Sequence, residues 1–124
     1  MPDATGLELL AQQLRDADAD AVLDTLHFRG RATIIVDPRK VPAVLEQLRG
    51  QGYTFLASVH GVDYYPEEPR LGVLYELLDM ERVDRITVKL RVHTDAAEVP
   101  SVTDAWPTAD HQEREVYDLS LIHI

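Results

Sequence analysis

The sequence has 124 residues, a formal net charge of −10, 45% hydrophobic and 27% charged residues, and no Cys. These values fit one globular domain and exclude whole-chain disorder, disulfides, a thiolate nucleophile and a Cys-ligated iron–sulfur cluster within this chain. The acidic excess argues against a nucleic-acid partner and against docking on anionic lipid by charge, and solubility alone would account for it.

The first half of the chain predicts a helix, two strands and a second helix. Thr5 is the expected N-cap of the first helix, whose apolar face follows an i, i+3, i+7 spacing (Leu7, Leu10, Leu14). Strands are expected at 22–28 and 32–36, with a short hairpin turn at 29–31. Asp37-Pro38 begins the second helix, and its apolar stripe ends before two glycines (Val41, Val44, Leu45, Leu48; Gly50, Gly52).

Three more strands and two terminal helices are predicted in the second half. The strands are expected at 53–60, 71–78 and 85–93, with loops at 61–69 and 79–84. Ser101 is the expected N-cap of a helix beginning at 100–104, which Trp106-Pro107 would break. Thr108 would cap a final helix through 109–119.

The strand at 85–93 has the clearest alternation in the chain. Its apolar residues are expected to face the helices, and its polar residues the opposite side of the sheet (Ile86, Val88, Leu90, Val92; Arg85, Thr87, Lys89, Arg91). That opposite side would either be wet or meet a partner. The predicted fold class is therefore α+β: a two-layer sandwich in the order helix, two strands, helix, three strands and terminal helices, with a largely antiparallel mixed sheet.

No motif in the sequence predicts a catalytic, metal or phosphate site. The five histidines lack a metal-ligand spacing, and neither glycine pair forms a phosphate-binding loop. The acidic loop at 63–68 fits no Ca²⁺ loop and is expected to be solvated. In the helix at 109–119, Arg114 is expected to pair with Asp110 and Asp118, while Glu113 and Glu115 point in different directions.

One long segment nevertheless resembles a known family. Residues 100–109 (PSVTDAWPTA), followed by 113–119 (EREVYDL), are similar to the P-S-V-T-x-x-W-x-x-A and E-R-E-x-Y-D signature of the C subunit of the proton-pumping NADH:quinone oxidoreductase, respiratory complex I. Residues 61–64 (GVDY) resemble the G-V-D-Y segment of that family. Residues 75–78 (YELL) stand where the family often has Y-H-L, so Glu76 departs from its pattern.

The resemblance implies a non-catalytic scaffold subunit of the peripheral arm, which supports electron transfer from NADH to quinone coupled to proton translocation. It implies partner subunits D and B, no cofactor in this chain, and flavin and iron–sulfur clusters in other subunits. The chain would reach the membrane only through the complex, at its cytoplasmic face. The residues implied to organise the partner interface belong to the signature: Trp106, Glu113, Arg114, Glu115, Tyr117 and Asp118.

Three alternatives remain at this stage. The first is the equivalent subunit or domain of a membrane-bound hydrogenase or a related quinone or coenzyme dehydrogenase. The second is a free-standing small-molecule enzyme, which requires a deep pocket with converging titratable groups. The third is an independent binding module. Genomic neighbours and co-purifying proteins distinguish them.

The end of the chain departs from the family pattern. After Leu119, the family continues with an apolar pair, a glycine turn and a basic segment, whereas this sequence has Ser120-Leu121-Ile122-His123-Ile124. The expectation is a single domain at 1–119, with a foreign tail at 120–124 on a truncated gene fragment. A natural short variant is the alternative. At the other end, the first residues lack the pattern of a signal peptide, and no apolar run approaches the roughly 18 residues of a spanning helix.

Overall fold

The computed structural model describes residues 4–120 and 122–124 and forms an α+β fold. A five-stranded mixed sheet has the order β1-β2-β5-β4-β3, in which β2 and β5 are parallel and every other neighbouring pair is antiparallel. The elements, in chain order, are α1 (Ala4–Ala17), β1 (Val22–Phe28), β2 (Arg31–Val36), the 3-10 turn η1 (Pro38–Lys40), α2 (Val41–Gly50), β3 (Phe55–Asp63), β4 (Leu71–Asp79), β5 (Asp84–Val92), the 3-10 turn η2 (Thr94–Ala96) and α3 (Ala109–Ser120).

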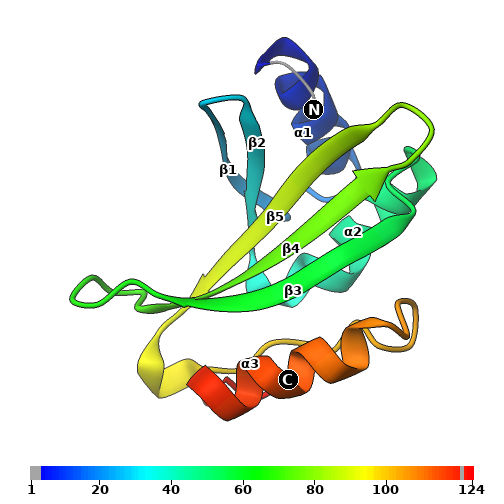
Figure 1. The fold of residues 1–124 in the computed structure, drawn as a ribbon. Coiled ribbons are helices and arrows are strands. Elements are labelled where there is room, and N and C mark those ends of the chain that lie inside the picture. Colours follow the sequence, from blue (N-terminus) through cyan, green and yellow to red (C-terminus); the bar gives the residue numbers. More distant parts are fainter. Residues whose placement is uncertain (1–3, 121) are drawn as a thin grey trace.

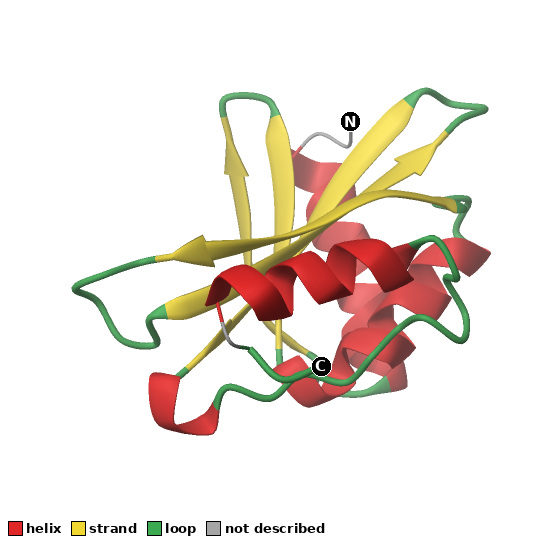
Figure 2. Cartoon of the chain, turned by 60° about the horizontal axis from the view of Figure 1, so that its bottom comes forward, coloured by secondary structure: helices red, strands yellow, loops and turns green. Residues whose placement is uncertain are grey.

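The helices lie on one side of the sheet and along one of its edges. In Figure 1, α1 and α2 lie behind the strands and α3 runs alongside β3; Figure 2 brings α3 forward. Gln112 of α3 accepts a hydrogen bond from the backbone N–H of Val59 at 2.5 Å. Because β3 is an edge strand, this bond satisfies a backbone donor there that has no neighbouring strand.

The local signals in the first half give the predicted elements. Arg29 (φ 53°) and Gly30 (φ 75°) form the two-residue turn between β1 and β2, which requires two left-handed residues. Asp37 caps η1 by accepting from the backbone N–H of Arg39. The apolar faces predicted for α1 and α2 are buried, although α1 begins at Ala4, so Thr5 lies inside its first turn and is not its N-cap.

The alternation of β5 is confirmed. Ile86, Val88 and Leu90 are fully buried, while Arg85 is exposed on the other face. On that second face Thr87 is buried as well, because its hydroxyl donates to Glu76 on the neighbouring strand at 2.9 Å.

The bounds predicted for the strand at 53–60 are wrong in part. The strand begins at Phe55 and continues to Asp63, so the predicted loop loses its first three residues. A register shift between Leu56 and Ser58 changes which face the next residues take. Leu56 and Val59 are therefore both buried, and Phe55 is half exposed.

The helix start predicted at 100–104 does not form, and the only helix described after η2 is α3. The hydroxyls of Ser101 and Thr103 are instead occupied by Glu113, as described below. In the segment 120–124, Ile122 is fully buried and His123 pairs with Glu98 in a single parallel bridge, while Leu121 lies outside the described residues. The foreign origin of this segment stays a prediction.

Candidate functional site

One carboxylate of α3, the helix that carries residues 113–119 of the signature, points inward. Glu113 is 6% exposed, although it is an ionisable residue. Its Oε1 accepts from the hydroxyls of Ser101 and Thr103, each at 2.7 Å, and its Oε2 accepts from the backbone N–H of Val102 at 2.9 Å. A carboxylate that accepts three hydrogen bonds is compensated for its lost water. Glu113 therefore fixes residues 101–103 against α3.

The side chain of Tyr75 is buried, and the negative charge of Glu113 acts on its hydroxyl. Tyr75 on β4 is 0% exposed, and its hydroxyl has no hydrogen-bond partner within residues 4–120 and 122–124. Burial, together with the negative charge of Glu113, raises the pKa of the Tyr75 phenol. The phenol therefore stays neutral at physiological pH.

Trp106 is the second signature residue that points inward. Its side chain is 5% exposed, and the guanidinium of Arg49 from α2 stacks over its ring at 4.1 Å. Arg49 also donates to the carbonyl of Ala105. The Trp106 contact therefore joins α2 to the segment before α3, and its role in this fold is packing.

The other four signature residues point outward. The side chain of Arg114 is 74% exposed and pairs with Asp110 at 3.4 Å. Glu115 contacts His111 at 3.3 Å, and the Tyr117 ring lies 5.4 Å from the His123 ring. Arg114, Tyr117 and Asp118 line a groove of about 520 Å³, which is also bounded by Ser101, Thr103, Asp110, Glu113, His123 and Ile124.

The charges on this outer face are only partly paired. Within the described part of the chain, Arg114 makes an ion pair with Asp110 but not with Asp118, so one of the two predicted pairs is wrong. Glu113 and Glu115 do point in different directions, as predicted. The structure thus divides the predicted interface residues into two that hold the fold together and four that present polar groups to solvent.

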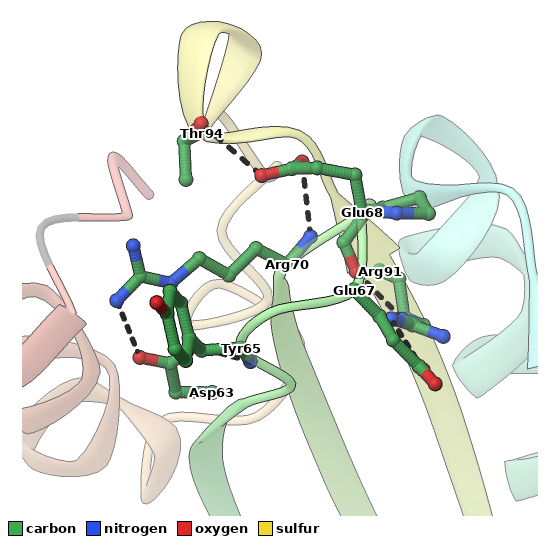
Figure 3. Close-up of polar contacts among 8 residues, drawn as sticks. Asp63, Tyr65, Glu67, Glu68, Arg70, Arg91 and Thr94 are labelled. Carbon is green, nitrogen blue, oxygen red and sulfur yellow. Dashed lines mark hydrogen bonds and ion pairs between the residues drawn. The ribbon is translucent and has the colours of Figure 1, made fainter.

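A second polar network joins β3 to β4 across the loop that was predicted to be solvated. Figure 3 shows Arg70 against Asp63, with Nε to Oδ1 at 2.8 Å and Nη2 to Oδ2 at 2.9 Å. This fork-shaped pair, together with the backbone N–H of Tyr65, lowers the pKa of Asp63 to about 2. One of the three acids of this loop is therefore paired with an arginine next to the loop.

Glu68 extends this network to the end of β5. Its carboxylate accepts from the backbone N–H of Arg70 at 3.1 Å and from the Thr94 hydroxyl at 3.4 Å, and it contacts His93 Nδ1 at 3.1 Å. Nearby, Arg91 Nε donates to the carbonyl of Pro69 at 2.8 Å. Arg91 Nη2 lies 3.9 Å from Glu67, beyond hydrogen-bond distance, so that contact is electrostatic only.

The Tyr64 side chain holds the G-V-D-Y segment against the sheet. Its ring lies under Lys89 Nζ at 4.6 Å and under the Arg91 guanidinium at 4.2 Å. The same ring covers Gly72 on β4, where a Cβ atom would come within 2.6 Å of Tyr64 Cε2. The partners of Tyr64 come from two later strands, and no local sequence spacing could have indicated them.

Neither a metal site nor a membrane helix is found in the described residues. No group of three or more His, Asp or Glu side chains in residues 4–120 and 122–124 is placed to hold a metal ion. No helix in the same part of the chain is both long and apolar enough to cross a membrane.

Comparison with known proteins gives consistent matches over most of the chain. Residues 34–124 match the family model described as the 30 kDa subunit of the respiratory-chain NADH dehydrogenase. The chain is 37% identical over 122 residues to the C subunit of the NADH-quinone oxidoreductase of Roseiflexus sp. (strain RS-1). It is 41% identical over 120 residues to the C subunit of the same enzyme in Saccharopolyspora erythraea. These alignments cover 96% and 94% of this chain, and 68% and 48% of the two relatives.

Two solved structures share the fold. The trypsin-resistant fragment (1-134) of Nqo5 superposes with a TM-score of 0.79 at 28% identity, covering 93% of this chain and 94% of that fragment. A chain of the membrane-bound sulfane sulfur reductase, an archaeal respiratory membrane complex, superposes with a TM-score of 0.72 at 25% identity, covering 90% of this chain and 65% of that one. This chain therefore spans the fragment almost fully and about half to two-thirds of the two curated relatives.

Proposed function

The chain belongs to the family of the 30 kDa subunit of the respiratory-chain NADH dehydrogenase, and from this membership we propose that it is a non-catalytic scaffold subunit of the peripheral arm of an NADH:quinone oxidoreductase. In this role it supports electron transfer from NADH to quinone, coupled to proton translocation, by holding neighbouring subunits in place. It belongs to a membrane-associated complex, and we place it at the cytoplasmic face.

The observation that carries the scaffold role is the use of the signature carboxylate. The Glu113 carboxylate accepts hydrogen bonds from residues 101–103, and the nearby Tyr75 phenol is buried and neutral. The groove beside α3 does gather titratable side chains, Glu113 among them, but the Glu113 carboxylate already accepts three hydrogen bonds from residues 101–103. The groove beside α3 is lined by Arg114, Tyr117 and Asp118, whose partly unpaired charges suit contact with another protein.

We propose subunits D and B of the complex as the neighbours of this chain, with the outward side chains of α3 at the contact. The chain itself binds no flavin, iron–sulfur cluster or NADH, and the electrons pass through other subunits. The absence of Cys from the sequence supports this for the clusters, because thiolates are their usual ligands. Purified chain should have no visible chromophore, and a stoichiometric one would overturn this part of the proposal.

A second assembly is kept for the test although it is not favoured over the first. The structural likeness to a chain of the membrane-bound sulfane sulfur reductase supports the equivalent position in a related respiratory complex. The test is affinity purification of the full chain from cells that produce it, followed by quantitative mass spectrometry. NADH dehydrogenase subunits in equal amounts, with D and B among them, support the first proposal. A hydrogenase- or reductase-type large subunit in their place supports the second, and a monomeric chain contradicts both.

A further inference from the structure

One face of the sheet carries no helix among the described elements. The strand register places Leu74, Arg85 and Lys89 on the side opposite to the buried residues Val73, Ile86 and Val88. The parallel pairing of Thr33 with Thr87 and of Ile35 with Lys89 extends this side across β2, and therefore to Arg31. We call it the open sheet face and define it by Phe28, Arg31, Phe55, Leu74, Arg85 and Lys89. In Figure 1 it is the side of the strands turned away from α1 and α2.

Large apolar side chains are exposed at both edges of the open sheet face. Phe28 on β1 is 60% exposed, and Phe55 on β3 is 49% exposed. Phe55 pairs with Leu78, and Phe28 with Arg31, so both rings lie on this face. The two rings lie at opposite edges and do not form one contiguous apolar patch, so an occupant that covers both must span the sheet.

The bases of the open sheet face lack carboxylate partners. Several bases elsewhere in the described residues are paired, such as Lys40 with Asp18 and Arg70 with Asp63, although Arg15 on α1 is not. Arg31, Arg85 and Lys89 make no ion pair with any residue of 4–120 or 122–124, and Lys89 Nζ lies 4.6 Å from the centre of the Tyr64 ring. Glu76 also lies on this face, opposite Thr87, and its carboxylate accepts from the Thr87 hydroxyl at 2.9 Å. Acids outnumber bases by 22 to 12 in this sequence, so a shortage of carboxylates is not the reason.

We propose that the open sheet face is a docking surface for a segment of another polypeptide that carries carboxylates beside apolar side chains. Its carboxylates pair with Arg31, Arg85 and Lys89, and its apolar residues cover Phe28 and Phe55. A second copy of this chain fits poorly, because bases outnumber the acids Asp24 and Glu76 on each face and the two faces would repel. The net charge of −10 disfavours anionic lipid and nucleic acid as the occupant. The inference deepens the proposed scaffold function, because the segment would belong to a neighbouring subunit.

Zero-length cross-linking of the native assembly tests this directly. A carbodiimide joins an amine to a carboxylate that is in contact with it, and the chain has only two lysines, Lys40 and Lys89. Lys40 is an internal control, since it lies 2.7 Å from Asp18 of the same chain. After purification of the full chain from cells that produce it, Lys89 should be joined to an Asp or Glu of another polypeptide. If Lys89 joins only its own chain, or nothing, the proposal is overturned.

A matched pair of charge reversals gives a second test. Arg85→Glu reverses a base of the open sheet face, and Arg15→Glu reverses one on α1 that also lacks an ion pair with the described residues. The amount of chain retained in the assembly should fall about tenfold or more with Arg85→Glu and little with Arg15→Glu. Equal retention of the two variants would count against the proposal, as would Arg85-dependent binding of the purified chain to phosphatidylglycerol vesicles.

These outcomes are separable from those that test the scaffold function. The Lys89 cross-link is mapped in whichever assembly retains the chain. A cross-link to a hydrogenase-type subunit would support the docking surface and contradict the NADH dehydrogenase assignment. NADH dehydrogenase subunits that co-purify without a Lys89 cross-link to any of them would do the reverse.

Discussion

The Tyr64 ring lies against Gly72, so that a Cβ atom at residue 72 would fall 2.6 Å from Tyr64 Cε2 and 3.2 Å from the Leu90 carbonyl oxygen. The first contact is far inside van der Waals distance, and the second is tight against backbone that belongs to the sheet. Tyr64 is also held by Lys89 and Arg91, which limits where its ring can move. The absence of a side chain at residue 72 is therefore what lets the G-V-D-Y segment settle on the sheet.

Gly72→Ala is accordingly expected to lower the free energy of unfolding by about 1–3 kcal/mol, the usual cost of an overpacked site. The matched control is Gly50→Ala at the end of α2, where a Cβ atom meets nothing within 4 Å and the change should be neutral or slightly stabilising. Urea denaturation followed by circular dichroism gives both values. Similar values for the two variants would show that the Tyr64 ring moves aside at no cost.

Glu113→Gln should destabilise the chain by about 2–3 kcal/mol, because a buried carboxylate with three donors becomes an amide that must turn an N–H₂ group toward one of them. Glu115→Gln on the same helix is the control, with a side chain that is 61% exposed, and it should stay within about 0.5 kcal/mol of the parent. Chemical denaturation again provides the measurement. A Glu113 variant as stable as the Glu115 variant would remove the structural argument for the signature carboxylate.

Arg114→Ala should leave the isolated chain nearly as stable as the parent, within about 0.5 kcal/mol, because its ion pair with Asp110 is exposed. The amount of assembled complex on a native gel should nevertheless fall, because a charge beside the groove is lost. Turnover per assembled complex should not change. A normal amount of complex that turns over slowly would point to a role in the reaction and not in assembly.

The lowered pKa of Asp63 predicts that the folded chain loses stability at low pH. Its pKa is about 2 in the folded chain, against an ordinary value of 3.8, so the folded state binds its proton less readily than the unfolded state. The stabilisation is complete above pH 4 and is lost as the pH falls toward 2. Asp63→Asn should flatten the dependence of the urea midpoint on pH in this range. Asp95→Asn, which changes an exposed carboxylate in η2, is the control and should leave that dependence unchanged.

The sequence was sufficient where one element determines its own structure. The alternation of β5, the two-residue turn at Arg29 and Gly30 and the apolar stripe of α2 need no distant partner to be recognised. The register shift in β3 could not be predicted, because it is defined only against β4. The helix expected at 100–104 failed for a similar reason, since the competing acceptor Glu113 is about ten residues away along the chain.

The sequence predicted which segment forms the candidate site, but not the direction in which each side chain points. The inner face of α3 includes Ala109, Glu113 and Val116, and one ionisable residue among apolar ones does not identify itself as buried. The sequence pattern identified the residues of the signature. Only the fold shows that Trp106 and Glu113 point inward, whereas Arg114 and Tyr117 point outward. The loop network of Asp63 and Arg70 was missed because charged loops are usually solvated.

The parallel pairing of β2 with β5 has a consequence for synthesis of the chain on the ribosome. β2 has β1 on one side as soon as the hairpin closes, but its other side waits for β5, and only Thr33, Ile34 and Ile35 of β2 pair there. At about 5–20 residues per second, residue 87 is made roughly 3–10 s after residue 33. During that interval the nascent chain carries a strand edge flanked by Ile34 and Val36, side chains that are fully buried in the finished fold. The pairing of β2 with β5 is thus also the one that ends the exposure of this edge to aggregation and to chaperones.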